Sequence, residues 1–281
     1  MDMQNIVPKL DIKELRDGLY RIDDSGLSKC FLIVGSEKAC LIDTANGLND
    51  LGAAVRELTD KPLIVINTHG HPDHMMGNYC FDHAYMNSKD WDFVNDFLKD
   101  PMAVALIKEK GLFFPVPRDI NEGDVFDLGG RTLEIYALPG HSEGSIVLLC
   151  PEERLLFTGD SINHHLWLQF DGCPSIEENL EILESKSWLM EKADYILHGH
   201  GDGYDDISLV TYLKEALKEI IDGKTDSDEE IEWAPGQKCM RHNFRVPEDK
   251  EFNCIDSLVL YQKNNIRKQN GKRRSRDSND N

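Results

Sequence analysis

The chain has 281 residues, 40% of them hydrophobic and 8% aromatic, which is enough for one large folded domain or two small ones. The formal net charge of −20 would repel nucleic-acid phosphates, so a general nucleic-acid-binding function is disfavoured. No apolar run approaches the roughly 18 residues of a membrane span, and no signal peptide is evident. The seven cysteines lack CxxC spacing. We therefore expect a cytoplasmic protein that binds neither membrane nor nucleic acid.

Taken in chain order, the sequence is strand-rich, then helical, then strand-rich, then helical again. Short apolar or alternating segments predict strands, and apolar residues at helical spacing predict helices. The predicted strands are Leu19–Ile22, Cys30–Val34, Ala39–Ile42, Leu63–Ile66, Val125–Leu128, Thr132–Leu138, Ser145–Cys150, Leu155–Thr158, Tyr195–Leu197 and Ile255–Tyr261. The predicted helices are Asn46–Leu58, residues 88–111 with a break at Pro101, Ser175–Lys192 with Ser175 as cap, and Ile207–Ile221. This order predicts an α/β fold with two packed sheets and helices outside.

Charge marks two segments near the C-terminus. Asp226–Glu232 is acidic and is predicted to be an exposed linker. Residues 263–281 contain seven Lys or Arg and two Asp, which leaves a net charge of −25 on the remainder. Polar, charged sequence of this kind cannot bury apolar surface. We therefore predict a folded domain over residues 1–262 and a basic, disordered tail over 263–281.

A cluster of potential metal ligands follows the apolar strand Leu63–Ile66. Residues 69–74 read His-Gly-His-Pro-Asp-His. Imidazole and carboxylate are the usual ligands of zinc and similar divalent ions. A single turn cannot satisfy four such groups without an ion, and the apolar strand would anchor the turn. The pattern therefore indicates a metal or catalytic site and not merely a solvated polar loop.

The segment 69–74 resembles the HxHxDH signature of the metallo-β-lactamase superfamily. Four further segments resemble the other motifs of that family, in the same order and each after a predicted strand. They are Ile42-Asp43-Thr44, Leu138-Pro139-Gly140-His141-Ser142, Leu156-Phe157-Thr158-Gly159-Asp160 and Leu197-His198-Gly199-His200-Gly201. The resemblance covers about residues 19–203. It implies a four-layer αβ/βα sandwich, in which two mixed β-sheets pack face to face with helices outside.

The resemblance also implies a dinuclear metal site. The implied ligands are His69, His71 and His141 for the first ion, Asp73, His74 and His200 for the second, and Asp160 as the bridge. A hydroxide between the ions would be the nucleophile, and Asp73 would orient it and move its proton, so Asp73 and Asp160 are the implied catalytic residues. Asp43 would support the site without touching metal. Zinc is the expected ion, although iron and manganese accept the same ligands.

Two points about the site stay open at this stage. The family motif places its last ligand between two glycines, as at His200, but residues i and i+2 share a face, so His198 stays an alternative. In the loop after Asp160, we expect His164 and Trp167 to bind the substrate. The alternative there is a solvated histidine beside ordinary core packing.

The implied function is hydrolysis of a small ester, thioester, lactone or amide. Asp160 stands where true β-lactamases carry Cys or Ser, which favours the glyoxalase II and lactonase-like branches. A phosphodiesterase and a non-heme iron persulfide-type oxidoreductase are the alternatives. Flavodiiron-type enzymes are disfavoured because they carry Glu where this chain has His71. We expect a small-molecule substrate, and neither its identity nor the oligomeric state follows from the sequence.

Overall fold

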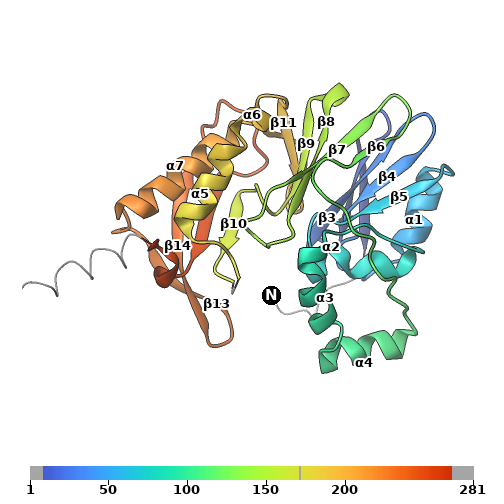
Figure 1. The fold of residues 1–281 in the computed structure, drawn as a ribbon, viewed down its shortest axis with the longest axis horizontal. Coiled ribbons are helices and arrows are strands. Elements are labelled where there is room, and N and C mark those ends of the chain that lie inside the picture. The colour runs from blue at the N-terminus through green and yellow to red at the C-terminus, as the bar shows by residue number, and fades with distance from the viewer. Residues whose placement is uncertain (1–8, 171, 268–281) are drawn as a thin grey trace, which may run out of the picture.

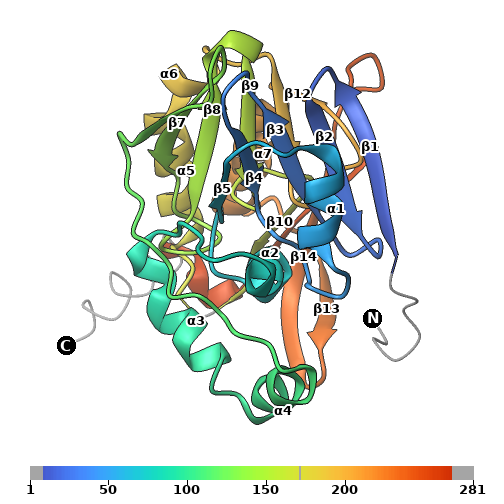
Figure 2. The same cartoon turned by 90° about the vertical axis from the view of Figure 1, so that its right-hand side faces the viewer.

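The computed structural model describes residues 9–170 and 172–267, in which three sheets form. The first sheet has the strand order β1-β2-β3-β4-β5, antiparallel except for the parallel pair β4–β5. Its strands are β1 (Leu10–Arg16), β2 (Leu19–Asp24), β3 (Ser28–Val34), β4 (Ala39–Ile42) and β5 (Leu63–Ile66). Helix α1 (Leu51–Leu58) packs its apolar side, Leu51 and Val55, on the outer face of this sheet (Figure 2).

The second sheet packs against the first. It has the strand order β12-β11-β9-β8-β7-β6, with a parallel pair β9–β11. Its strands are β6 (Val125–Asp127), β7 (Thr132–Ala137), β8 (Ile146–Cys150), β9 (Leu155–Gly159), β11 (Tyr195–His198) and β12 (Asp205–Asp206). Phe31 of β3 meets Phe157 of β9 in the core between the sheets, with ring centroids 5.7 Å apart. The predicted sandwich of two mixed sheets is confirmed.

A third sheet, which the sequence did not predict, lies beyond the second (Figure 1). Its order is β10-β15-β14-β13, with bounds β10 (His165–Leu168), β13 (Glu229–Ala234), β14 (Gln237–Arg245) and β15 (Asp256–Tyr261). With helices α5 (Ile176–Ser185) and α7 (Leu209–Asp222), it buries the outer face of the second sheet. The predicted linker over Asp226–Glu232 is therefore wrong, because β13 begins within it. Glu229 and Glu230 of β13 are exposed and pair with Arg241 and Lys238 of β14, the second pair at 2.8 Å.

Capping and proline chemistry set the helix ends. Helix α5 (Ile176–Ser185) starts with a capping box between Ser175 and Glu178, as Ser175 predicted. A short α6 (Ser187–Met190) follows, and α7 (Leu209–Asp222) ends at Gly223. Residues 88–111 break before Pro101, as predicted, into η3 (Ser88–Asp90), α3 (Trp91–Phe97) and α4 (Pro101–Lys110). The remaining short helices are α2 (Pro72–Met75), η2 (Met76–Cys80), η4 (Pro151–Glu153) and η5 (Lys263–Asn265).

The ordered domain extends past the predicted boundary at residue 262. Ile266 is buried in the core beneath the third sheet, and the Asn265 side chain donates to the Pro174 carbonyl over 2.9 Å. The rest of the predicted tail, residues 268–281, lies outside the described residues. No helix within the described ranges is both long and apolar enough to cross a bilayer.

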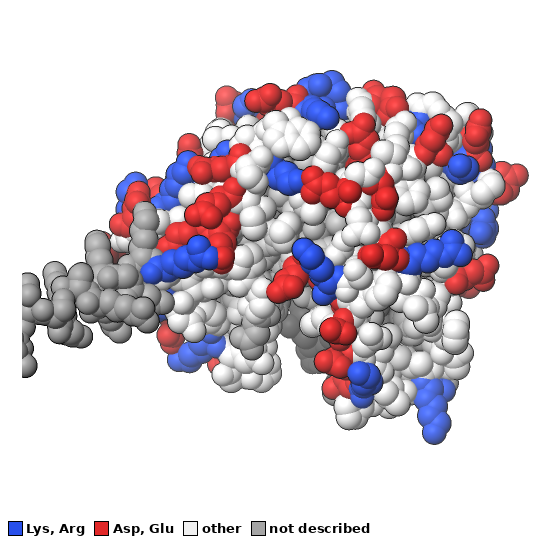
Figure 3. Space-filling view, viewed as in Figure 1, with Lys and Arg blue, Asp and Glu red and all other residues white. Residues whose placement is uncertain are grey.

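Acidic and basic side chains intermingle on the face seen in Figure 3. That face is indented at its lower edge, between the side that carries β13 and the side that carries α3 and α4 (Figures 1 and 3). The candidate site opens between these two parts of the fold.

Candidate active site

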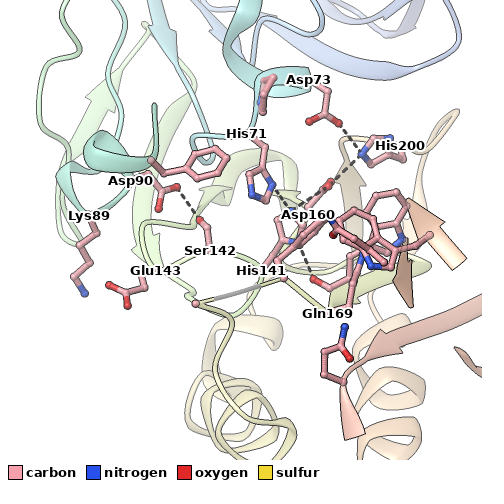
Figure 4. Close-up of a pocket in the computed structure, with 18 of the residues that line it drawn as sticks. His71, Asp73, Lys89, Asp90, His141, Ser142, Glu143, Asp160, Gln169 and His200 are labelled. Carbon is pink, nitrogen blue, oxygen red and sulfur yellow. Dashed lines mark hydrogen bonds and ion pairs between the residues drawn. The ribbon is translucent and has the colours of Figure 1, made fainter. Parts of the chain in front are cut away.

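The ends of strands bring the predicted ligands together (Figure 4). The loop from β5 to α2 carries His69 and His71. Helix α2 starts at Pro72, and the fixed φ of proline suits this first helical position. His74 follows on that helix, where it is fully buried. Asp73 lies on the same helix, His141 lies in the loop after β7, and Asp160 and His200 follow the ends of β9 and β11. All seven predicted metal ligands fall into two adjoining groups.

The first group consists of His69, His71 and His141. The His71 Nδ1 atom lies 3.1 Å from His69 Nε2 and 2.7 Å from His141 Nε2. The outer nitrogens of two rings are already occupied, because His141 Nδ1 donates to the Trp167 carbonyl over 3.0 Å and His69 Nδ1 lies 3.1 Å from Thr68 Oγ1. The inner nitrogens of His69 and His141 therefore have free lone pairs and converge with His71 Nδ1, an arrangement in which imidazoles bind a divalent ion.

The second group consists of Asp73, His74, Asp160 and His200. One Asp160 oxygen, Oδ2, lies 3.5 Å from His74 Nε2, 3.2 Å from His200 Nε2 and 3.7 Å from His141 Nε2 of the first group. Asp160 thus stands between the two groups, where a bridging carboxylate would stand. Within the described part of the chain, the buried atoms His74 Nε2 and Asp160 Oδ1 have no hydrogen-bond partner. Orphaned buried polar atoms are costly, and an ion would satisfy both of them.

Asp43 holds this second group from outside, as the sequence implied. Its carboxylate accepts His74 Nδ1–H at 2.8 Å and the Thr68 backbone N–H at 2.7 Å. Asp43 itself adopts a left-handed φ of 61°, a conformation unusual for a residue other than glycine. His200 is oriented in a similar way, since its Nδ1 donates to the Leu27 carbonyl over 3.0 Å. Both rings are thereby fixed with Nε2 toward the ligand cluster.

The two groups differ in protonation. Burial lowers the pKa of His69 and of His141, and burial lowers the pKa of His71 to about 3, so these rings are neutral near pH 7. In the second group burial also acts to lower the pKa of His74 and His200, but the nearby carboxylates, Asp160 first, raise both pKa values. The neutral rings of the first group can therefore bind a cation. In the second group, the positive charge of protonated His74 and His200 balances the negative charge of the carboxylates.

Asp90 is a site residue that the sequence did not reveal. Its buried carboxylate accepts the Gly70 N–H at 2.8 Å, the Ser142 hydroxyl at 2.7 Å and the Gly144 N–H at 2.7 Å. It therefore ties the loop of His69 and His71 to the loop of His141. Nothing in the local pattern signals this role, because Asp90 lies in a predicted helix and its partners are 20 to 54 residues away.

His198 and His164 lie together in a separate buried cluster with Asp205. His198 Nε2 is 2.8 Å from Asp205 Oδ2, and His164 Nε2 is 3.0 Å from Asp205 Oδ1. His198 thus turns away from the ligand cluster, whereas His200 joins it. His164 is 2% exposed, bonds Ser257 as well, and does not line the cavity described below. The structure therefore corrects the predicted substrate contact at His164.

A cavity of about 870 Å³ opens above the ligands. Four aromatic side chains wall it, from α3, from β10 and the loop after it, and from the β13–β14 hairpin; they are Phe93, Trp167, Phe170 and Trp233. The Phe170 ring contacts both His71 and His141, with centroids 5.4 and 5.7 Å apart. Trp167, which we predicted to bind the substrate, lines this cavity. Its contact with the substrate stays a proposal.

Residues 24–214 match the family model described as the metallo-beta-lactamase superfamily. Acyl-coenzyme A thioesterase MBLAC2 of Homo sapiens is 29% identical in an alignment of 182 residues, and the match covers 53% of this chain and 65% of that protein. This chain therefore spans somewhat less than two thirds of that relative. The atrochrysone carboxyl ACP thioesterase of Pseudocercospora fijiensis is 24% identical over 176 residues, 60% of this chain and 46% of that protein.

Solved structures agree on the fold. A metallo-beta-lactamase family protein from Thermus thermophilus superposes with a TM-score of 0.56 at 19% identity, over 77% of this chain and 85% of that one. The family match spans well over half of the chain and contains every one of the seven converging ligands. The chain belongs to the metallo-beta-lactamase superfamily.

Proposed function

We propose that this protein is a dinuclear metal-dependent hydrolase that cleaves small thioesters, with esters as the related substrate class. The observation that carries the proposal is the convergence of seven ligand side chains at the base of an aromatic-walled cavity. The names of two relatives, an acyl-coenzyme A thioesterase and an acyl carrier protein thioesterase, favour thioesters among the possible substrates.

The donor set fits two divalent ions, and its excess of imidazole favours zinc, with iron and manganese as alternatives. Bound there, the ions would supply Lewis acidity and lower the pKa of bound water. Asp160 would hold the spacing of the two groups, because it faces His74, His141 and His200 within 3.2 to 3.7 Å.

Asp73 is the residue best placed to move a proton. Its side chain is 37% exposed and lines the cavity, while its Oδ2 atom lies 3.5 Å from both His74 Nε2 and His200 Nε2. A carboxylate that faces the cavity and borders the ligands can accept a proton from water and return it to the departing thiolate. The aromatic walls, with Trp167 among them, would hold the acyl group and exclude bulk water.

The test is a hydrolase panel on protein loaded with zinc, iron or manganese. Thioesters, esters, lactones, a β-lactam and bis-nitrophenyl phosphate are compared by kcat/KM, with Asp160→Ala as the inactive control. We expect thioesters to rank first and Asp160→Ala to lose nearly all turnover. A protein that cleaves only the phosphodiester, or nothing at all with two ions bound, would refute the proposal.

A further inference from the structure

Gln169 carries an amide that has no hydrogen-bond partner. The residue is 4% exposed and lines the cavity just beyond the end of β10 (Figure 4). Among the described residues, neither its Oε1 nor its Nε2 finds a donor or an acceptor. A buried amide without hydrogen-bond partners costs free energy, so such amides are rare in folded proteins. One that lines a cavity can gain its hydrogen bonds from a ligand.

Gln169 lies close to the end of the cavity where the metal-ligand candidates His71 and His141 lie. Trp167, two residues earlier, accepts the hydrogen bond of the metal-ligand candidate His141, and Phe170, the next residue, contacts the His71 and His141 rings. Two residues of extended chain span at most about 7 Å. Gln169 therefore lies within the length of a short thiol arm from the first ligand group.

The unsatisfied atoms define the chemistry of the missing partner. A primary carboxamide offers an acceptor oxygen and, beside it, an NH2 group that donates, so its ligand must bring both a donor and an acceptor. Trp233, on the facing hairpin, also lines the cavity, and its Nε1 donor is buried without a partner in the described chain. The cavity therefore presents two donor groups, Gln169 Nε2 and Trp233 Nε1, and one acceptor, Gln169 Oε1. A ligand that has carbonyl groups and at least one N–H would satisfy all three. Secondary amides supply both groups.

We propose that Gln169 is a specificity-determining residue that binds a secondary amide in the thiol arm of the substrate. This inference rests on the proposed function and narrows it to thioesters whose thiol carries amides. Alkyl thioesters would bind only through the aromatic walls and would leave the Gln169 amide unsatisfied. The thiol arms of pantetheine and of glutathione both contain such amides, and a comparison of acyl-pantetheine with acyl-glutathione distinguishes these two sources.

The first experiment compares two butyryl thioesters, one of N-acetylcysteamine and one of 1-pentanethiol, which has no amide. Selectivity is the ratio of their kcat/KM values in the metal-loaded enzyme. We expect Gln169→Leu to lower this ratio about tenfold or more, because the loss falls on the amide substrate alone. Gln237→Leu is the matched control, since Gln237 lines the same cavity but is exposed. An equal loss on both substrates would overturn the proposal.

The second experiment needs no turnover. Two non-hydrolysable thioethers, S-butyl-N-acetylcysteamine and butyl pentyl sulfide, are titrated while the tryptophan fluorescence is followed, to which Trp167 and Trp233 in the cavity wall contribute. We expect Gln169→Leu to weaken only the amide ligand, again about tenfold. If Gln169→Leu does not fold, Gln169→Glu, which loses the Nε2 donor, replaces it.

These readouts separate the two proposals. Amide-selective binding that depends on Gln169, in a protein without thioesterase activity, keeps the recognition site and refutes the proposed function. Thioesterase activity with no Gln169-dependent selectivity keeps the function and refutes the recognition site.

Discussion

Replacing Asp90 by Asn should loosen the first metal group although Asp90 is not one of its ligands. The Asp90 carboxylate receives three buried hydrogen bonds, from Gly70, Ser142 and Gly144, at 2.7 to 2.8 Å. An Asn side chain can keep an acceptor oxygen toward Gly70 and Ser142 only if its NH2 group faces the Gly144 N–H. Two donors then oppose each other in a buried place.

The expected cost follows from those contacts. One bond to a charged acceptor is worth about 1.5–3 kcal/mol, and the two remaining bonds lose their charge assistance. We therefore expect Asp90→Asn to lower the free energy of unfolding by roughly 2–4 kcal/mol. For a chain of this size that is a decrease in Tm of about 4–7 °C. Because Asp90 orients the loops of His71 and His141, affinity for the first ion should fall about 10–100-fold.

The assay has two parts. Thermal and urea unfolding of chelator-treated protein report stability without metal, and competition with a chromophoric chelator reports the affinity of each ion. Asp92→Asn, an exposed neighbour, is the control and should change neither quantity. If Asp90→Asn matches the wild type in both stability and metal affinity, the reasoning from these three hydrogen bonds is wrong.

Three further predictions follow from the ligand geometry. Elemental analysis of wild-type protein from metal-sufficient medium should give close to two ions per chain, and a content near zero would contradict the site. Removing the ions should lower the free energy of unfolding by about 2.7 kcal/mol for each site at which the free metal concentration had been 100 times Kd. His200→Ala should leave about one ion per chain at saturating metal while His198→Ala keeps both, and the reverse pattern would exchange their roles. Gly199→Ala should disrupt the second group, because a Cβ there would lie 2.3 Å from His74 Cε1, and unchanged metal binding would show that the loop yields easily.

The sequence by itself points to a metal site only at residues 69–74, a dense cluster of ligand side chains after an apolar strand. The inclusion of His141, Asp160 and His200 came from the resemblance of their short segments to the motifs of the family. The alternation of strands and helices was sufficient for the layered fold. These features depend on neighbours within a few residues, so no tertiary information was needed.

What the sequence could not predict depends on pairing between distant segments. Strand β13 is acidic, so its own sequence does not indicate a strand. It pairs with β14, where Lys238 and Arg241 form ion pairs with Glu230 and Glu229. His164 has the same chemistry as a ligand histidine, but the segment that carries it pairs with β15, where the His164 carbonyl accepts the Leu258 N–H at 2.9 Å. That pairing leaves the His164 ring buried against Asp205 and Ser257.

The cluster of Asp205, His198 and His164 leads to a final prediction about His200. The His200 backbone N–H donates to His198 Nδ1 over 3.3 Å, so the ring proton of His198 is on Nε2, which lies 2.8 Å from Asp205 Oδ2. In Asp205→Asn, the NH2 group would oppose His198 Nε2–H in one orientation of the amide and the Asn253 backbone N–H in the other. If His198 changed tautomer, its Nδ1–H would oppose the His200 N–H instead. We therefore expect Asp205→Asn to weaken the second ion about 10–100-fold with every ligand intact.

The stability effect of Asp205→Asn should also depend on pH, and this separates a charged cluster from simple packing. Burial acts to raise the pKa of Asp205, but the hydrogen bonds from His164 and His198 hold it well below its usual range. A carboxyl whose folded-state pKa is depressed contributes stability above its unfolded pKa of about 3.9, and that contribution is lost as pH falls further. The advantage of metal-free wild type over Asp205→Asn, measured by urea unfolding, should therefore be about 3 kcal/mol at pH 7 and shrink below pH ~4. Asp249→Asn is the control because the Asp249 side chain is exposed. A wild-type advantage that stays constant down to pH ~3 would mean that packing, and not the Asp205 charge, holds the His200 loop.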